Sequence, residues 1–348
     1  MSAPGALDRV GEVWDGARLD LAALERYCRA TLPDFGGPLA VQQFHGGASN
    51  PTYLLTDQET GTRYVLRKQP PGALLASAHA VDREHRVMAA LAGSGVPVPP
   101  MLAFCSDLAV IGTPFYLMPF LAGRIYTRNL LGDMMPRERR LAYQDIARTL
   151  AALHAIDPSA VGLGDFGRAG NYYARQITRW TRQYRDAETE TIASMERLIA
   201  ALPDRMPPDD ALSVVHGDFR QENLMFAPAA PRVIAVLDWE LSTLGHPLAD
   251  LAFFCLFYHA DFMGWGEGID WDRDGVPREA EFVADYQAHA GRPPVTDWSF
   301  YLAFAAFRLA SIAQGVTRRV AEGKARADLG RRSSARQWAD LAWRLWES

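Results

Sequence analysis

The hydrophobic period of this 348-residue sequence changes close to residue 119. Before that point, short runs rich in β-branched and aromatic residues alternate with turn residues, a pattern typical of antiparallel strands. After it, apolar residues recur at helical spacing over long stretches. A strand-rich front and a helix-rich remainder predict an α+β protein of two lobes, because alternating βαβ units would mix the two periods. We expect an N-terminal lobe over residues 1–118 and a mostly helical C-terminal lobe over 119–348, with ligands bound between them.

The predicted N-terminal lobe combines a helical prelude over residues 1–38 with a small five-stranded sheet and one helix. The strands are expected at 39–44, 52–56, 63–67, 101–105 and 115–118, and the helix at 78–91. In the second lobe the pattern predicts helices at 138–156, 172–202, 298–320 and 331–346, and a hairpin formed by 224–226 and 232–237.

Composition and charge narrow the classes of function. The 36 basic and 41 acidic residues give a net charge of −5, which argues against a chain-wide basic surface for nucleic acid. There is no run of eighteen apolar residues that would span a membrane, and the first residues lack the basic flank and apolar core of a secretory signal. The three cysteines form no CxxC pair, so the sequence favours neither a disulfide framework nor a zinc site. We therefore expect a cytoplasmic protein that binds neither nucleic acid nor membrane.

The most informative segment is a loop in the second lobe. His216, Asp218 and Asn223 have the spacing H-x-D-x-x-x-x-N of a kinase catalytic loop, and Asp238 ends the next apolar strand, as a metal-binding aspartate does in kinases. Phosphoryl transfer needs one carboxylate at the acceptor hydroxyl and further oxygen ligands that hold Mg²⁺ on the phosphates. We expect Asp218 to accept the hydroxyl proton, and Asn223 and Asp238 to bind Mg²⁺. Each residue alone would be an ordinary turn or cap residue, but their joint spacing favours catalysis.

These residues identify a resemblance that covers roughly residues 38–320. The chain resembles the aminoglycoside phosphotransferase and choline kinase-like family, whose fold is similar to that of protein kinases. The resemblance implies a two-lobed protein-kinase-like fold, ATP and Mg²⁺ as cofactors, and a small-molecule hydroxyl as the acceptor. Within the family, residues 236–252 (VLDWELSTLGHPLADLA) are most similar to the kinase-like domain at the front of some acyl-CoA dehydrogenases.

The resemblance also implies a nucleotide site in the N-terminal lobe. Met118 is expected to offer its backbone to adenine. The loop between the first two strands is expected to approach the phosphates through backbone N–H groups, although it lacks the G-x-G-x-x-G of protein kinases. Its residues are Gly46, Gly47, Ala48, Ser49 and Asn50.

One cation from the third strand should contact the α and β phosphates, and Glu84 on the following helix should pair with it. Adjacent strand residues point to opposite faces, so either Arg67 or Lys68 can take this role. The resemblance favours Arg67, and Lys68 stays the alternative, as one of only two lysines in the sequence.

Three further residues are expected to support the loop. Arg220 lies two residues after Asp218 and could neutralise charge on the transferred phosphoryl group; the alternative is an exposed surface arginine. His216 is expected to brace the loop through hydrogen bonds. The resemblance implies that Asp250 is a buried aspartate that anchors the loop backbone by accepting N–H bonds.

The identity of the acceptor depends on the helical lobe. From Arg308 onward the chain carries nine basic and four acidic residues, a net charge of +5, and the rest totals −10. A basic end favours a carboxylate or CoA-bearing acceptor over a cationic one, unless these residues only form i,i+4 pairs on helix faces. With the resemblance, this predicts a phosphotransferase with an alcohol acceptor, namely an ATP-dependent kinase of a hydroxy acid or hydroxyacyl-CoA.

Two alternatives stay open. An aminoglycoside-type antibiotic kinase would be supported by carboxylates that gather between residues 260 and 290, and this segment does contain Asp261, Glu267, Asp270, Asp272, Asp274, Glu279 and Glu281. A nucleotide-binding regulatory pseudokinase would be expected to lack Asp218, Asn223 or Asp238, and the sequence retains all three.

Overall fold

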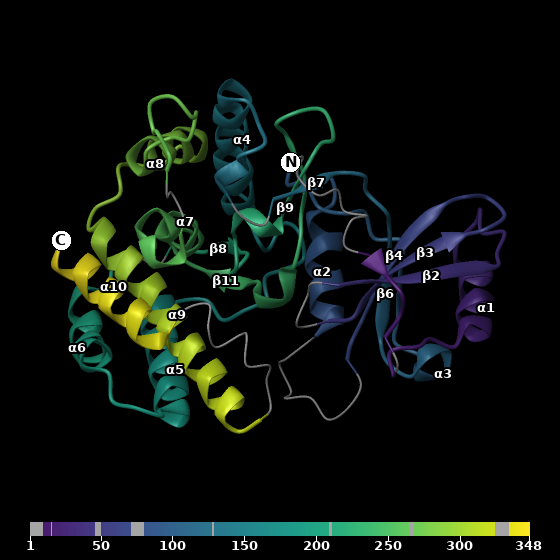
Figure 1. Cartoon of the computed structure of the whole chain (residues 1–348), viewed down its shortest axis with the longest axis horizontal. Coiled ribbons are helices and arrows are strands. Elements are labelled where there is room, and N and C mark those ends of the chain that lie inside the picture. The colour runs from purple at the N-terminus through teal and green to yellow at the C-terminus, as the bar shows by residue number, and fades with distance from the viewer. Residues whose placement is uncertain are drawn as a thin grey trace. The chain divides into compact units, whose positions relative to one another are not determined.

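The computed structural model describes residues 10–14, 16–45, 50–70, 80–126, 129–208, 211–264, 268–323 and 334–348. The chain divides into two units, drawn in one colour gradient in Figure 1. The first comprises residues 1–127 and 222–242, and the second comprises 128–221 and 243–348. This division differs from the predicted boundary after Met118, because strand β7 (Arg124–Ile125) pairs with strand β9 (Leu224–Phe226) and so joins a later hairpin to the first unit.

The first unit contains a six-stranded antiparallel sheet in the order β1-β2-β3-β4-β6-β5. The five predicted strands are confirmed, and a sixth, β1, pairs with the outer edge of β2. At two residues, β1 is too short to show an alternating pattern, so the helical prelude predicted for residues 1–38 was incomplete. The strands are β1 (Val10–Gly11), β2 (Leu39–Phe44), β3 (Thr52–Asp57), β4 (Arg63–Lys68), β5 (Ala103–Cys105) and β6 (Phe115–Pro119).

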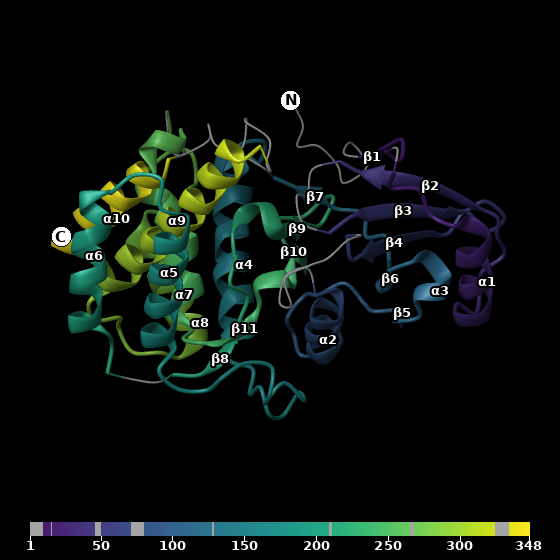
Figure 2. The ribbon, with the colours of Figure 1, turned by 90° about the horizontal axis from the view of Figure 1, so that it is seen from below.

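Helices cover this sheet on different sides (Figure 2). The core beneath α1 (Leu21–Thr31) includes Tyr64 and Leu66 of β4. Asp20 caps α1 by accepting the Ala23 N–H at 3.0 Å. Because side chains alternate along a strand, Arg67 points away from this core, toward α2 (Val81–Leu91). A short helix, α3 (Leu108–Ile111), also contacts α1.

The hairpin predicted near residue 230 is confirmed. Strand β9 pairs with β10 (Val233–Val236), and β7 completes a three-stranded sheet in the order β10-β9-β7. Its small core joins Ile125, Met225 and Ala235. The hairpin ends in a 3₁₀ turn at Trp239–Leu241, which contacts α2.

The second unit is mainly helical. A two-stranded sheet of β8 and β11 carries the catalytic-loop segment at its edge. The helices and strands of the second unit are α4 (Pro136–His154), α5 (Tyr172–Ala187), α6 (Ala193–Ala201), β8 (Ser213–Val215), β11 (Thr243–Gly245), α7 (Leu248–Cys255), α8 (Glu279–Ala290), α9 (Trp298–Ala321) and α10 (Ala335–Glu347). Short 3₁₀ turns lie at Asn129–Leu131, Leu202–Arg205, Gln221–Asn223, Leu256–His259 and Asp261–Met263.

The single helix predicted over residues 172–202 is wrong, since the structure has two helices there, α5 and α6. The break is stabilised by tertiary hydrogen bonds that a helical pattern does not reveal. Gln314 of α9 donates to the Ala187 carbonyl at 3.3 Å and to the Thr189 hydroxyl at 2.7 Å. The Tyr184 hydroxyl accepts the Ile192 N–H at 3.2 Å.

Helix α9 forms the centre of the second unit. Among the described residues it is the one helix long and apolar enough to cross a membrane by length and composition, although the sequence lacks an unbroken apolar run. The structure buries 67% of its most apolar window, and α9 packs against α5 and α10 (Figure 1). Burial of that extent is what the core helix of a globular unit shows.

Candidate active site

The backbone of the catalytic loop is held by a buried carboxylate. Asp250, on α7 and 1% exposed, accepts the His216 N–H at 2.6 Å and the Gly217 N–H at 2.8 Å. Gly217 has a φ of +80°, a left-handed conformation that glycine adopts without strain. These bonds match the anchoring geometry expected of Asp250, and they fix the backbone immediately before Asp218.

A histidine that the sequence analysis missed completes this anchor. The His154 ring lies 3.4 Å from the Asp250 carboxylate through Nε2 and 2.8 Å from the Tyr286 hydroxyl through Nδ1. Burial lowers the pKa of His154, so its ring is neutral, donates from Nε2 and accepts from Tyr286. Burial alone would raise the pKa of Asp250, but the bonds from His154 and Gly217 keep it below its usual value. Asp250 therefore stays ionised.

Arg308 also contacts the backbone of Gly217. Its Nη2 donates to the Gly217 carbonyl at 2.5 Å, so the Gly217 peptide is bonded to both α7 and α9. Sequence analysis counted Arg308 only as the start of a basic end. The signal available was an arginine in the middle of a predicted apolar helix, where a charged side chain requires a specific partner.

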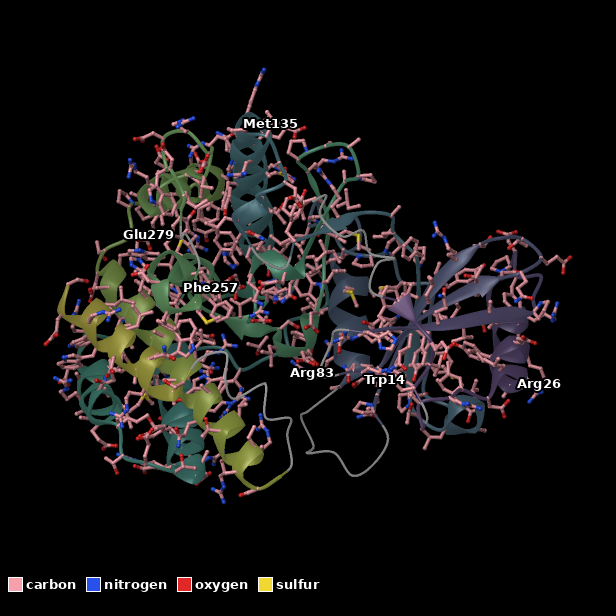
Figure 3. All side chains as sticks on the ribbon, in the orientation of Figure 1. Trp14, Arg26, Arg83, Met135, Phe257 and Glu279 are labelled. Atoms are coloured by element: carbon pink, nitrogen blue, oxygen red, sulfur yellow. The ribbon has the colours of Figure 1, made fainter. Side chains whose placement is uncertain are left out.

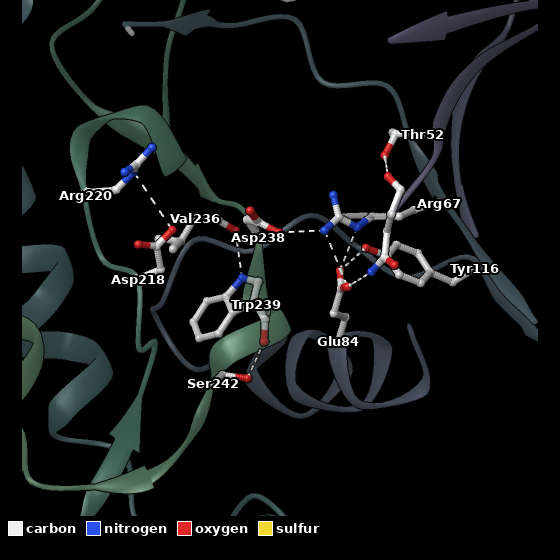
Figure 4. A network of polar contacts seen from close by, with 11 residues as sticks. Thr52, Arg67, Glu84, Tyr116, Asp218, Arg220, Val236, Asp238, Trp239 and Ser242 are labelled. Carbon is white, nitrogen blue, oxygen red and sulfur yellow. Dashed lines mark hydrogen bonds and ion pairs between the residues drawn. The ribbon is translucent and has the colours of Figure 1, made fainter. Parts of the chain in front are cut away.

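The loop residues predicted for catalysis lie beside this anchor. The Asp218 N–H donates to His216 Nδ1 at 3.2 Å, which is the bracing geometry expected of His216. The Asp218 side chain is 24% exposed, and its carboxylate lies 3.9 Å from Arg220 Nε (Figure 4). Arg220 is therefore close to Asp218 but too far for a hydrogen bond through this pair of atoms.

A cluster of charges lies in the first unit (Figure 4). Arg67 Nε is 2.9 Å from Glu84 Oε2, and Arg67 Nη2 is 2.6 Å from Asp238 Oδ1. Burial alone would lower the pKa of Arg67, but the charges of Glu84 and Asp238 hold it above its ordinary value. One guanidinium thus lies between two carboxylates, in the geometry predicted for Arg67 with Glu84.

Glu84 is 1% exposed and has two further donors. The Tyr116 hydroxyl donates to Oε2 at 3.0 Å, and the Asn50 amide donates to Oε1 at 2.5 Å. Sequence analysis missed Tyr116 and expected Asn50 to belong to a phosphate-covering loop; the side-chain amide of Asn50 faces Glu84, and the role of its backbone stays a prediction. The other loop residues of that prediction, Gly46–Ser49, lie outside the described residues.

Lys68 lies on the opposite face of β4. It is 6% exposed and shares its face with Tyr64 and Leu66, which belong to the core beneath α1. Burial lowers the pKa of Lys68. Of these two adjacent cations, Arg67 contacts Glu84, and Lys68 lies on the opposite face of β4.

The two predicted metal ligands are neighbours on the hairpin. The Leu237 N–H donates to the Asn223 carbonyl at 2.8 Å, which places Asp238 beside Asn223 at the end of β10. The Asp238 side chain is 34% exposed and offers carboxylate oxygens, and Asn223 adds an amide oxygen. Among the described residues, no three His, Cys, Asp or Glu side chains gather into a metal site. Two oxygen ligands fit Mg²⁺, which keeps water and phosphate oxygens as the rest of its shell.

Met118 lies on β6 opposite Val65 and precedes Pro119, the last residue of that strand. The Phe120 N–H that follows donates to the Arg63 carbonyl at 3.0 Å. The contact of Met118 with adenine stays a prediction.

An apolar cavity of about 20 Å³ lies in the second unit. Gln221, three residues after Asp218, forms part of its wall, and the Tyr258 hydroxyl is buried without a hydrogen-bond partner in the described part of the chain. Phe257 of this wall is labelled in Figure 3. The other lining residues are Leu130, Tyr143, Phe254, Phe257 and Trp271. The cavity has room for about one water or the end of an apolar group.

Comparison with known families agrees with this geometry. Residues 40–304 match the model of the Phosphotransferase enzyme family. The chain belongs to this family. The protein-kinase-like fold and the family resemblance predicted from the sequence are thereby confirmed.

The chain is similar to parts of longer curated proteins. It is 44% identical over 328 residues to acyl-CoA dehydrogenase family member 10 of Mus musculus, covering 92% of this chain and 30% of that protein. It is 40% identical over 358 residues to the probable acyl-CoA dehydrogenase IBR3 of Arabidopsis thaliana, covering 96% of this chain and 43% of that protein. The chain therefore spans less than half the length of these relatives.

Solved structures give the same family. The crystal structure of a candidate aminoglycoside phosphotransferase from Ralstonia eutropha JMP134 is 45% identical, with a TM-score of 0.86, and the match covers 95% of this chain and 99% of that one. A choline kinase from Cryptosporidium parvum has a TM-score of 0.63 at 13% identity, with 94% of each chain covered, and this likeness concerns the fold alone.

The acidic residues between 260 and 290 are engaged in local structure. Glu279, labelled in Figure 3, bonds to His259 at 2.9 Å and to the Trp298 indole at 2.9 Å, within the second unit. Glu281 pairs with Arg140, and Asp272 pairs with Arg278. Glu267 lies outside the described residues. Asp270 and Asp274 accept backbone N–H groups within their own loop.

Proposed function

We propose that the chain is an ATP-dependent small-molecule kinase that transfers the γ-phosphate of ATP to the hydroxyl of a hydroxy acid or hydroxyacyl-CoA. The observation that supports ATP as the phosphate donor is the position of the Arg67 guanidinium between Glu84 and Asp238. A buried glutamate that orients one strand cation is the arrangement by which kinases hold the α and β phosphates. A cytoplasmic location, where ATP is available, would suit this activity.

Asp218 is proposed to act as the base. The acceptor oxygen attacks the γ-phosphorus, Asp218 takes the hydroxyl proton, and the bond from the γ-phosphorus to the β–γ bridging oxygen breaks to leave ADP. Anchoring by Asp250 supports this role, because a fixed backbone keeps the carboxylate in one position. Arg220, 3.9 Å from Asp218, is proposed to neutralise charge on the phosphoryl oxygens.

Asn223 and Asp238 are the residues proposed to hold Mg²⁺. When bound, the ion would neutralise phosphate charge. Arg67 would bind the α and β phosphates, the backbone of Met118 would bind adenine, and the loop from Gly46 to Asn50 would cover the phosphates.

The acceptor class is supported by two independent features. Curated relatives that are 40% and 44% identical are named acyl-CoA dehydrogenases, a name that refers to an acyl chain on CoA, whereas the solved relative at 45% identity is named an aminoglycoside phosphotransferase. The cavity near Gln221 is lined by apolar and aromatic side chains, which suit the end of an acyl chain better than a polycationic sugar. Three acidic residues of the 260–290 segment, Glu279, Glu281 and Asp272, are paired with histidine or arginine, which leaves them less available to a cationic acceptor.

The test is an ADP-release assay with the full chain, ATP and Mg²⁺. Acceptors are hydroxy acids, hydroxyacyl-CoA thioesters, aminoglycosides, choline and simple sugars, with mass spectrometry of the product. We expect turnover of a hydroxy acid or its CoA thioester. Brisk phosphorylation of an aminoglycoside or choline with no acyl acceptor used would overturn the substrate class. Nucleotide binding without turnover of any acceptor would favour the regulatory pseudokinase.

A further inference from the structure

Two arginines of the second unit, Arg179 of α5 and Arg308 of α9, have no carboxylate partner among the described residues. Several other arginines of this unit pair with carboxylates: Arg140 with Glu281, Arg185 with Glu196, Arg318 with Glu322, and Arg336 with Glu190. Arg308 instead bonds to the Gly217 carbonyl, directly before Asp218.

Both guanidinium groups lie against one aromatic ring. The guanidinium carbon of Arg179 lies 5.0 Å from the centroid of the Trp180 ring, and that of Arg308 lies 5.4 Å from the same centroid. Arg308 also lies 5.3 Å from the Phe253 ring. Partial burial and the neighbouring charge of Arg308 lower the pKa of Arg179. Two like charges held close together cost free energy unless an anion joins them.

The free donors of this pair are available to a ligand. Within the described part of the chain, the Gly217 carbonyl is the one hydrogen-bond acceptor that Arg308 contacts, and its buried Nε has none. A guanidinium carries five N–H donors in a planar fork that matches carboxylate or phosphate. The nearby carboxylate of Asp250 already accepts from His216, Gly217 and His154, so it does not serve as the counterion of Arg308.

Tyr172 adds a neutral donor to the same region. Its ring packs against Gly245, where an added Cβ would lie 2.5 Å from the ring. Burial raises the pKa of Tyr172 to about 12, while the positive charges of Arg308 and Arg179 act in the opposite direction. Its phenol therefore stays protonated beside the two arginines.

We infer that Arg179 and Arg308, with Tyr172, form an anion subsite next to Asp218 that binds a carboxylate or phosphate group of the acceptor. This inference rests on the proposed function, since it assigns the specificity of the same reaction. The bond from Arg308 to Gly217 ties the subsite to the residue that precedes the proposed base. An acceptor anchored there by its anion is selected over a neutral or cationic compound.

The experiment compares acceptors that differ only in their anion. A hydroxy acid is paired with its primary amide, and a hydroxyacyl thioester of 4′-phosphopantetheine, the phosphate-bearing arm of CoA, with the same thioester of pantetheine, which lacks the phosphate. The variants of the full chain are Arg179→Gln, the charge-retaining Arg179→Lys, and the control Arg182→Gln, also on α5. For each, kcat and KM are measured for the acceptor and for ATP, and thermal unfolding verifies the fold.

We expect the wild type to prefer one anionic member by about tenfold or more in kcat/KM, the range of one charge-assisted contact. Arg179→Gln raises KM for that member and leaves kcat, KM for ATP and the neutral member unchanged. Arg179→Lys retains part of the preference, and Arg182→Gln retains all of it. A preference within the acid pair identifies the carboxylate as the anion, and one within the thioester pair identifies the phosphate of the phosphopantetheine arm. An unchanged preference in Arg179→Gln, or equal use of both members by the wild type, overturns the subsite.

A binding measurement separates this inference from the proposed function. If no acceptor is phosphorylated, the proposed function fails, and the subsite is tested by titrating inorganic phosphate into the wild type and Arg179→Gln. Weaker phosphate binding by Arg179→Gln than by Arg182→Gln supports the subsite. Equal binding by both variants overturns it.

Discussion

The Arg67 guanidinium and the Asp238 carboxylate form an ion pair at 2.6 Å, although 171 positions separate them in the chain. The hairpin that carries Asp238 belongs to the same unit as the sheet that carries Arg67. Asp238 has a φ of +65°, which is uncommon for a residue other than glycine. The backbone is thus held in an unusual conformation where a carboxylate meets the proposed phosphate-binding cation.

Arg67 and Lys68 offer a direct test of the nucleotide site. We expect Arg67→Met to weaken ATP binding by about tenfold or more, because a charge-assisted contact is lost. Lys68→Met should leave ATP affinity within about twofold, since Lys68 shares the face of the α1 core. Isothermal titration calorimetry with a non-hydrolysable ATP analogue measures the nucleotide affinity of both variants. The same loss in both variants would contradict the assignment.

The Arg67 variant needs a stability control, because it leaves Glu84 buried beside Asp238. Breaking a buried ion pair costs about 3–5 kcal/mol of unfolding free energy. Glu84→Gln combined with Arg67→Met removes that uncompensated charge. The double variant should recover stability in urea without recovering ATP affinity.

Asp218 is predicted to act in the chemical step. Asp218→Asn should lower kcat by about 10²-fold or more, within the range of a lost general base, at unchanged ATP affinity. Steady-state ADP release measures kcat, and titration with nucleotide measures ATP affinity. Wild-type turnover in this variant would refute the role of Asp218 as base.

Asp250 is predicted to stabilise the fold through the loop backbone. Asp250→Asn removes the charge that two backbone N–H groups and His154 share, so the free energy of unfolding should fall by about 2–4 kcal/mol. Asp272→Asn, which removes half of an exposed pair with Arg278, should change it by less than about 1 kcal/mol. Urea unfolding measures both, and equal effects would contradict an anchoring role.

His154 should give the fold a specific pH dependence. Its folded pKa lies below the ordinary value of 6.5, so the unfolded chain binds a proton more readily. The associated stability is present above pH 6.5 and is lost as the pH falls from 6.5 toward the folded pKa, at up to about 1.4 kcal/mol per pH unit. Asp250, Tyr286 and Arg292 act on this ring.

The test compares urea unfolding at pH 7.5 and pH 5.0 in the wild type and His154→Gln. The variant should lose less stability between the two values, since other histidines contribute equally to both proteins. The same loss in both proteins would show that His154 does not control this dependence.

Sequence reasoning predicted the elements whose pattern is local. Strand alternation in β4 reduced the choice of cation to Arg67 or Lys68, and the loop spacing singled out Asp218 and Asn223. The contacts of Tyr116 and His154 could not be predicted, because each depends on a side chain from a distant element. Neither residue stands in a motif, and a buried aromatic or histidine is ordinary in a core.

The broken helix near residue 190 illustrates the same limit. The segment between α5 and α6 contains neither glycine nor proline to mark an end. Gln314, more than a hundred residues later, supplies the hydrogen bonds that favour the break. Chain-distant partners of this kind override a helical pattern without leaving a local signal.

The path of the chain limits how this protein can be divided. The segment 222–242 belongs to the first unit while both of its flanks belong to the second, so the chain passes between the units three times. A fragment that ends at residue 127 would keep Arg67 and Glu84 but lack Asp238. If the chain were split after residue 127, the two pieces would have to reassemble through the pairing of β7 with β9. A swap of the first unit between relatives would therefore require two exchanged segments.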